Sequence, residues 1–499
     1  MKIKRFLCWA AFAFCVPLAH AQVGAAKPPA GPDPASLTEA QIKKTEVPGV
    51  LYRLAAAYKQ SGDLERLTWA LERLTAVLPN TGELKLALAS VYAERGESSK
   101  TYDLLLRMQQ QGFGYDLSNN PSFSKVAGTR VWTYIVENLS ANLKPFGEGK
   151  TAFTLPKGDY LFESLAFDPK RKQFLAGSVR EGKIYLVGKD GKLQDFIAPD
   201  ADNGLWSVYA MAIDAEHDAL YVASTSSVYF KGFKQGDYGK AGVFKFKLSS
   251  GKLTKKYLLA PDNQPRTLSS IAIGKNGQVF AADGLRNTIY RLDGDALKPM
   301  VENPKLTSIR GLAVSGDGKQ LYFADYALGI FGVDLAAGKG FDLDYAGNKL
   351  VLGGIDGLYW YDNTLVVIEN GMSPKRVMRL QLEENGRKVG NVMPLDVANA
   401  AFTLPTYGAI DGDGLYFVAN SQKKAYDTYG VPKDESKLEP IHVFRSDLRY
   451  AWNESGIGSH VTLVPKQAPT APRSGLFNNV EGGAQSTDAR DDATPSGGG

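Results

Sequence analysis

Several short stretches of this chain have part of the spacing of a catalytic or binding motif. Residues 149–151 (Gly-Lys-Thr) end like a phosphate-binding loop, but Lys144 stands where the loop needs its first glycine. Residues 122–125 have the Ser-x-x-Lys spacing of a serine nucleophile and its base, without the companion motifs of those enzymes. Two stretches rich in Asp and Gly, 200–204 and 411–414, lack the full spacing of a calcium-binding loop. We therefore do not expect a phosphate-binding loop at the first stretch, and we interpret the second as a loop and the two stretches rich in Asp and Gly as turns.

The residue types best suited to nucleophilic or metal chemistry are scarce. Both cysteines, Cys8 and Cys15, lie within the first 21 residues. The histidines beyond that point, His217, His442 and His460, have no paired spacing. Without its N-terminal leader the chain would have no thiolate nucleophile, disulfide or cysteine-based metal site, and we expect neither a zinc site nor a histidine-based triad.

The N-terminal residues have the features of a secretory signal peptide. Three basic residues precede an apolar run over 6–14, and Ala19 and Ala21 supply the small side chains that signal peptidase needs. We expect a signal peptide over residues 1–21, cleaved after Ala21, and a periplasmic or secreted protein. No later run reaches the roughly 18 apolar residues of a membrane-spanning helix, so no membrane span is predicted.

The charge balance argues against one class of partner. The chain has 58 Lys and Arg residues against 53 Asp and Glu residues, a formal net charge of +5. Loss of the three basic residues in the leader would leave 55 basic residues, and a net charge of +2. A nearly neutral chain gives no reason to propose a nucleic acid or an anionic membrane surface as a partner.

A helical segment follows the leader. Residues 22–46 are rich in proline, which blocks helix formation and sheet pairing, so we expect an extended linker. Over residues 47–145 the pattern is helical, and similar residues recur 34 positions apart. The matched pairs are Leu54 and Leu88, Ala55 and Ala89, Tyr58 and Tyr92, Gly62 and Gly96, Leu71 and Leu105, and Leu74 and Met108. The pattern resembles the tetratricopeptide family, which implies helix-turn-helix units with glycine at the turn.

Two such units leave their outer faces uncovered, so a further element has to cap them. The apolar periodicity of residues 131–143 predicts a capping helix, which could also dock on the next domain. Two interpretations of the helical segment stay open. It is either a platform for packing or a groove for a peptide or partner helix.

Short strands are predicted over residues 150–465, where six copies of one motif are found. In its clearest copy, 308–326, an apolar run meets a turn of Ser, Gly and Asp, and a β-rich run then ends on Asp325. The equivalent positions, 41 to 60 residues apart, are Ala166, Ala212, Ala272, Ala313, Tyr359 and Ala409. Four strands with their turns occupy roughly 40 to 50 residues, which is one propeller blade. The predicted fold is therefore mainly β: a six-bladed β-propeller preceded by a small all-α domain.

A ring of blades has to be closed, because an open ring would expose sheet edges. The sixth unit has strands at 416–419 and 441–445 but no obvious outer strand directly after them. Residues 151–155 stand before the first unit and are similar to outer strands elsewhere, so we predict that they pair with the last blade. Residues 466–499, rich in Gly, Ser, Pro, Asp and Thr, are expected to form a disordered tail.

The repeat resembles the six-bladed propellers of the regucalcin/gluconolactonase family, and more loosely NHL-type propellers, over about residues 155–450. The resemblance rests on residues 162–168, 310–325 and 355–358. In metal-dependent members a divalent cation lies at one mouth of the central channel, held by glutamate, asparagine and aspartate at the starts of inner strands. The equivalent ring in this chain is Glu163, Tyr209, Ser269, Arg310, Asp356 and Thr406. Aromatic residues expected near the ring, mostly as core, are Trp206, Tyr209, Tyr326, Tyr359, Trp360 and Tyr407.

The ring departs from the family pattern at Arg310. Glu163 and Asp356 match the acidic ligands, but Arg310 stands at an asparagine position, and Tyr209 stands at or near another. A guanidinium has five donors and no acceptor, so it cannot ligate a cation. We expect Arg310 to replace the metal by bridging Glu163 and Asp356. The alternatives are a reduced metal site with Arg310 turned away, and no contact among the three.

Two functions of different classes follow. The first is an exported, non-catalytic binding or scaffolding protein that uses the channel mouth and the helical groove to recognise a protein, a sugar or another small molecule, without a cofactor. The alternative is a metal-dependent, lactonase-like hydrolase of the gluconolactonase type. In that case Glu163 and Asp356 would hold a calcium-like cation that polarises the substrate carbonyl and activates water. Arg310 favours the first.

Overall fold

The computed structural model describes residues 33–262, 264–347 and 349–449. The predicted signal peptide over 1–21, the boundary at 465 and the tail over 466–499 lie outside these ranges. Within them, no helix combines the length and the apolar character needed to cross a membrane.

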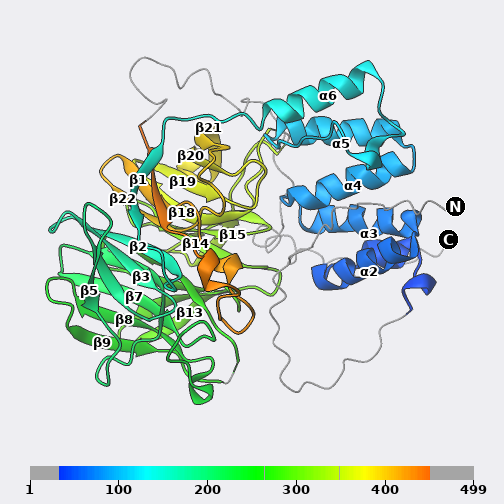
Figure 1. Cartoon of the computed structure of the whole chain (residues 1–499). Helices are drawn as coiled ribbons and strands as arrows, with labels where there is room; N and C mark the ends of the chain where they lie inside the picture. The colour runs from blue at the N-terminus through cyan, green and yellow to red at the C-terminus, as the bar shows by residue number, and fades with distance from the viewer. Residues whose placement is uncertain (1–32, 263, 348, 450–499) are drawn as a thin grey trace, which may run out of the picture. The chain divides into compact units, whose positions relative to one another are not determined.

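Six α-helices come first in the part of the chain that the structure describes. Their bounds are α1 (Glu39–Lys44), α2 (Pro48–Ser61), α3 (Leu64–Val77), α4 (Gly82–Glu94), α5 (Ser98–Gln110) and α6 (Arg130–Ala141). From α2 to α6 each helix packs on the next, as the blue-to-cyan part of Figure 1 shows. Gly62 and Gly96 follow the first helix of each pair with φ angles of 74° and 76°, a left-handed conformation that glycine adopts without strain. The predicted glycine turns are thereby confirmed.

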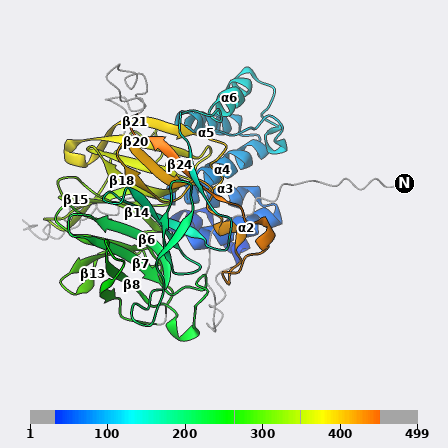
Figure 2. The ribbon, with the colours of Figure 1, turned by 60° about the vertical axis from the view of Figure 1, so that its left-hand side comes forward.

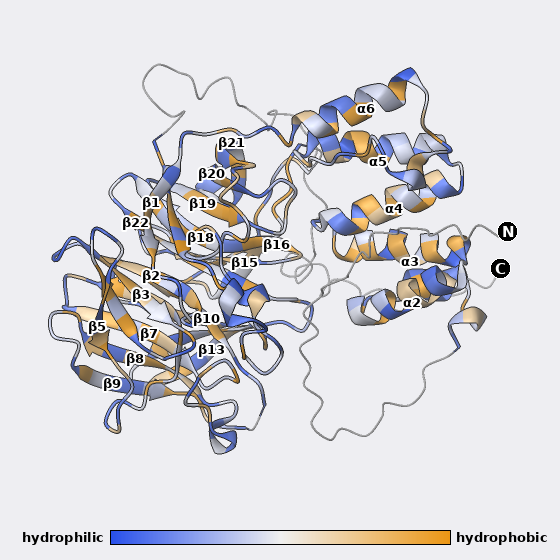
Figure 3. Ribbon diagram, viewed as in Figure 1, coloured by the Kyte–Doolittle hydropathy of each residue, from blue (hydrophilic) through white to orange (hydrophobic). Residues whose placement is uncertain are grey.

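The central helix, α4, is covered on several sides by α3, α5 and the turn that precedes α6. Its buried residues therefore do not follow a single stripe, and Figure 3 shows hydrophobic colour along its middle. A helix that is apolar around much of its circumference has to lie in the interior of its segment.

The helical segment begins earlier than predicted. Helix α1 lies inside the stretch 22–46, which we predicted as an extended linker. Thr38 and Gln41 form a capping box, in which the Thr38 amide donates to Gln41 Oε1 at 2.8 Å and the Gln41 amide donates to Thr38 Oγ1 at 3.4 Å. Ile42 is fully buried, and α1 packs on α3. This capping pair and one buried side chain outweigh the proline-rich composition just before them.

Within the described residues, twenty-four strands follow in six four-stranded antiparallel sheets. The first three blades are β2 (Phe162–Asp168), β3 (Gln173–Ser178), β4 (Ile184–Val187) and β5 (Leu193–Ile197); β6 (Ser207–Asp214), β7 (Ala219–Thr225), β8 (Ala241–Lys247) and β9 (Leu253–Leu258); β10 (Leu268–Ile273), β11 (Val279–Asp283), β12 (Thr288–Asp293) and β13 (Ala296–Glu302). The others are β14 (Ile309–Val314), β15 (Gln320–Asp325), β16 (Gly329–Asp334) and β17 (Lys339–Asp342); β18 (Ile355–Tyr361), β19 (Thr364–Glu369), β20 (Arg376–Glu383) and β21 (Lys388–Val397); β22 (Gly408–Asp411), β23 (Gly414–Val418) and β24 (Ile441–Asp447), with β1 (Lys150–Leu155). The chain is thus a six-bladed β-propeller behind a helical segment.

The last blade is closed by the first strand of the sheet region. β1 pairs with β24 in antiparallel register, with Thr151 opposite Phe444 and Leu155 opposite Ile441. The predicted closure by residues 151–155 is therefore confirmed. β24, orange in Figure 2, also contacts β21 of the preceding blade, and β22 packs on β2 of the first.

The helical segment packs on loops of the fourth and fifth blades. Asn80, between α3 and α4, donates to the Leu328 carbonyl at 2.7 Å and accepts from the Tyr345 hydroxyl at 3.0 Å. Gly114, after α5, exchanges two 2.7 Å hydrogen bonds with Ser373. One of these loops, between β17 and β18, leads directly into an inner strand. The helices therefore contact the end of the propeller at which the inner strands begin.

The mouth of the central channel as the candidate functional site

A β-bulge at the start of five inner strands builds the predicted ring. In each of these strands the pairing with the second strand of the blade skips one residue. The skipped residues are Glu163, Tyr209, Ser269, Arg310 and Asp356. A bulged residue is released from the ladder and its side chain is turned out of the regular alternation. The sixth member, Thr406, lies just before β22, and its amide donates to the Val418 carbonyl at 2.9 Å.

Arg310 pairs with one of its two predicted carboxylates. Its Nε lies 3.8 Å from Asp356 Oδ1. Between Arg310 and Glu163 there is no ion pair, although both lie in the described part of the chain. Glu163 Oε1 instead accepts a hydrogen bond from Ser421 Oγ, and Lys423 is close enough to lower its pKa. The three-residue cluster is thus reduced to one direct pair with a second carboxylate nearby.

The carboxylate of Asp356 is held by a chain of polar contacts. Asn370 Nδ2 donates to Asp356 Oδ2, and the Tyr326 hydroxyl donates to Asn370 Oδ1 at 2.9 Å. The Arg310 guanidinium lies 5.6 Å from the centre of the Tyr326 ring, within the range of a cation–π interaction. Tyr326 therefore contacts both partners of the pair, one directly and one through Asn370.

The charges of the mouth are strongly affected by burial. Burial raises the pKa of Glu163, and the positive charges of Lys423 and Arg310 offset this only in part. Burial alone would lower the pKa of Arg310, but Asp356 and the tyrosines beside it raise the pKa, so the guanidinium stays charged. Burial also raises the pKa of Tyr407, which keeps its hydroxyl protonated and able to donate.

Four buried polar atoms at this mouth have no hydrogen-bond partner within the described part of the chain. They are Arg310 Nε, Asp356 Oδ1, Thr406 Oγ1 and the Tyr407 hydroxyl. The 3.8 Å between the first two is too long for a hydrogen bond. Each buried, unsatisfied polar group costs about 1–3 kcal/mol, so four of them around one mouth constitute unused binding capacity.

The two other ring residues are occupied within the fold. The Tyr209 hydroxyl donates to Ser227 Oγ at 2.9 Å, and Ser269 Oγ donates to the Ile309 carbonyl at 3.3 Å. They belong to the wall of the mouth, and their polar groups are already satisfied.

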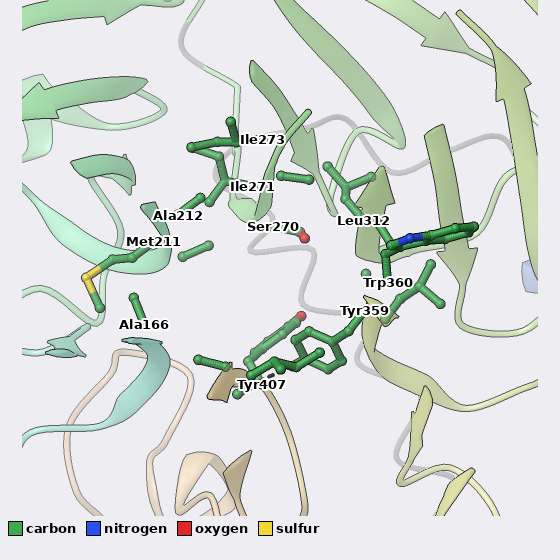
Figure 4. Close-up of a pocket in the computed structure, with 18 of the residues that line it drawn as sticks. Ala166, Met211, Ala212, Ser270, Ile271, Ile273, Leu312, Tyr359, Trp360 and Tyr407 are labelled. Carbon is green, nitrogen blue, oxygen red and sulfur yellow. Dashed lines mark hydrogen bonds between the residues drawn. The ribbon is translucent and has the colours of Figure 1, made fainter. Parts of the chain in front are cut away.

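Behind the mouth lies a cavity of about 480 Å³ lined by all six inner strands. Its wall combines apolar side chains with serine and tyrosine hydroxyls, and Figure 4 shows Met211, Ile271, Leu312 and Trp360 around it, with Tyr407 at one side. Tyr209, Ser269 and Tyr407 line the cavity and are ring residues or their neighbours. The cavity therefore reaches the level of the ring at Tyr209 and Ser269, and its lining begins at Gly311 and Tyr407, next to Arg310 and Thr406.

The residues of the mouth do not fit a divalent cation. Among the described residues there is no group of three or more His, Cys, Asp or Glu side chains arranged to hold a metal ion. Calcium needs six to eight oxygen ligands around one point, and the mouth offers two carboxylates with a guanidinium beside one of them. A cation here would be repelled by Arg310.

The structure adds three residues that we did not predict for this site: Asn370, Ser421 and Lys423. Asn370 directly follows β19, and Ser421 and Lys423 lie in the segment after β23. Asp283 and Asp325 end the second strands of two other blades and accept backbone hydrogen bonds. The equivalent residue of the fifth blade is Glu369, and Asn370 is the residue after it, so the repeat did not point to Asn370.

No protein-family model matches this chain, and no curated protein matches it. Among solved structures, a gluconolactonase from Xanthomonas campestris is 12% identical, over 62% of this chain and 92% of its own, with a TM-score of 0.40. The PQQ-bound aldose sugar dehydrogenase from Streptomyces coelicolor is 15% identical, over 61% of this chain and 99% of its own, with a TM-score of 0.39. Virginiamycin B lyase from Staphylococcus aureus is 15% identical, over 55% and 82%, with a TM-score of 0.38. Likenesses this distant carry no functional argument.

Proposed function

We propose that this chain is an exported, non-catalytic binding protein whose ligand site is the mouth of the propeller channel. The observation that carries the proposal is a set of four buried polar atoms, on Arg310, Asp356, Thr406 and Tyr407, that satisfy no hydrogen-bond geometry within the described part of the chain. A folded protein seldom leaves such groups unsatisfied, and a ligand with matching donors and acceptors would satisfy them. The signal-peptide pattern of residues 1–21 supports export.

The chemistry of the mouth favours binding over turnover. A lactonase-like hydrolase would use a cation to polarise the substrate and to activate water. Arg310 supplies a fixed positive charge at this place and cannot coordinate a water molecule. Glu163 and Asp356 are both engaged, the first by Ser421 and the second by Asn370.

The helical segment supports the scaffolding part of the proposal. Its contacts through Asn80 and Gly114 place α3 to α5 against the loops at the mouth end. A helical wall beside the mouth would restrict which ligands, or which partner segment, can reach Arg310, whose side chain is 25% exposed.

The test compares binding with turnover in the same preparation. A panel of small polar and anionic molecules is screened by thermal shift on the wild type, Arg310→Met and Asp356→Asn, and lactone hydrolysis is measured with and without a chelator. We expect at least one compound to stabilise the wild type and to lose that effect in Arg310→Met, with no chelator-sensitive turnover. Lactone hydrolysis that is abolished by the chelator and by Asp356→Ala would overturn the proposal in favour of the hydrolase.

A further inference from the structure

We infer that the ligand is amphipathic: a carboxylate group binds Arg310 at the mouth, and an apolar tail extends into the channel between the inner strands. This inference rests on the function proposed above and adds the chemical class of the ligand. Two observations carry it: polar atoms at the mouth that make no hydrogen bond within the described residues, and the apolar side chains in the wall of the cavity that begins at Gly311 and Tyr407.

The mouth is suited to a carboxylate. A guanidinium presents a planar fork of donors that matches a carboxylate, and Arg310 Nε is unused in the described part of the chain. The Thr406 hydroxyl has no hydrogen-bond partner there either, and the Tyr407 hydroxyl lies beside the Arg310 guanidinium, so both can donate to an anion at this place. Asp356, held by Asn370, lies 3.8 Å from Arg310 Nε, too far for a hydrogen bond, so this donor is left for a second carboxylate.

The cavity is suited to an apolar chain. Its volume of about 480 Å³ is within the range of small-molecule sites, and its wall continues from Tyr407 through Leu312 and Met211 to Trp360. Trp360 lies four residues beyond Asp356 on the same strand, which corresponds to about 13 Å of extended chain.

The first experiment measures how affinity depends on tail length. Octanoate, decanoate and dodecanoate are titrated by calorimetry into the wild type, Arg310→Met, and the channel-filling variants Ala212→Leu and Ala409→Leu. Both alanines line the cavity and are half-buried, so a larger side chain there takes up channel volume. Ala56→Leu, on an exposed position of α2, is the matched control.

The expected result is an affinity that rises about fourfold for each added methylene in the wild type and in the Ala56→Leu control. The channel-filling variants should lose at least tenfold for dodecanoate, and Arg310→Met should weaken all three acids. Two filling variants are used so that disturbed packing between blades at one position does not decide the result. Circular dichroism of each variant shows whether it is folded.

The second experiment determines the orientation of the ligand. Dodecanoate with bromine at the ω carbon should quench the fluorescence of Trp360, whereas bromine at the α carbon should quench it much less. Trp360→Phe removes this signal and identifies its source. Quenching by the α-bromo acid alone would place the carboxylate at the wrong end and would overturn the inference.

The possible failures are distinguishable. Equal affinity for the three acids, or unchanged binding in both channel-filling variants, would show that the channel is not used. If these acids, or another member of the small-molecule panel, still bind in an Arg310-dependent manner, the inference falls and the proposed function stands. If nothing binds through Arg310, both fall.

Discussion

Because β1 closes the last blade, shortening a single buried side chain in this strand should strongly lower the stability of the protein. Leu155 is the last residue of β1, is fully buried, and pairs with Ile441 of β24. It packs in a cluster with Phe162 and Val443, so its side chain joins the closing strand to both the last and the first blade. Leu155→Ala would open a cavity at the seam of the ring.

The magnitude follows from burial. Truncating a fully buried leucine to alanine costs about 2–5 kcal/mol, from lost transfer free energy and the residual cavity. Leu258, at the end of the outer strand β9, is 54% exposed, so Leu258→Ala should change the free energy of unfolding by no more than about 0.5 kcal/mol. The losses in free energy of unfolding caused by Leu155→Ala and Leu258→Ala should therefore differ by about 2–4 kcal/mol.

The assay is urea unfolding followed by tryptophan fluorescence. With a slope of about 3 kcal/mol per molar urea, a loss of about 3 kcal/mol lowers the midpoint by about 1 M. The slope should not change, because both variants expose the same surface on unfolding. Equal midpoints for Leu155→Ala and Leu258→Ala would refute the idea that β1 seals the ring.

Three further predictions concern other parts of the chain. Burial raises the pKa of Asp396 from 3.8 to about 6. The protonated carboxyl therefore stabilises the fold below pH 4, and this contribution to the free energy of unfolding is lost as the pH rises through 6. Asp396→Asn should reduce the loss of stability between pH 4 and pH 7 by about 3 kcal/mol, measured as urea midpoints. Arg310→Asn should create calcium-dependent thermal stabilisation that the wild type lacks, because an oxygen ligand replaces the guanidinium beside Asp356; equal shifts in both would contradict this. A Cβ at Gly112 would lie 2.6 Å from Arg376 Nη1, and a buried ion pair with Glu369 holds that arginine in place. Gly128 has a similar positive φ, but a Cβ there would meet open space. Gly112→Ala should therefore lower the free energy of unfolding by at least about 1 kcal/mol more than Gly128→Ala in the same assay.

The fold could be predicted well because it depends on patterns that repeat. Alternating strands and turns recur six times, and the 34-residue period places Gly62 and Gly96 at equivalent turns. Closure by 151–155 followed from the missing outer strand of the last unit. The start of the helical segment was missed because its signal is local. A capping pair and one buried side chain, Ile42, are too little to outweigh a proline-rich neighbourhood when only composition is considered.

The candidate site could be predicted only in part, because its ring positions repeat and its partners do not. The position of Arg310 followed from its place in the repeat. Its failure to pair with Glu163 did not, because that depends on Ser421 and Lys423, which come from a segment after β23 with no counterpart in the repeat. Asn370, which holds Asp356, was also missed. Side chains that arrive from irregular loops cannot be placed by periodicity.

The bulges explain why such a site can change its chemistry without changing its fold. Because each of five ring residues is the extra residue of a bulge, its side chain is not needed for strand pairing, and the blade tolerates many residue types there. The cost of a charged residue at this position is therefore electrostatic. Arg310 meets part of that cost through Asp356 and the Tyr326 ring, and its unused donors are left for a ligand. The identity of the ring residues, more than the propeller itself, thus determines whether the mouth attracts a cation or an anion.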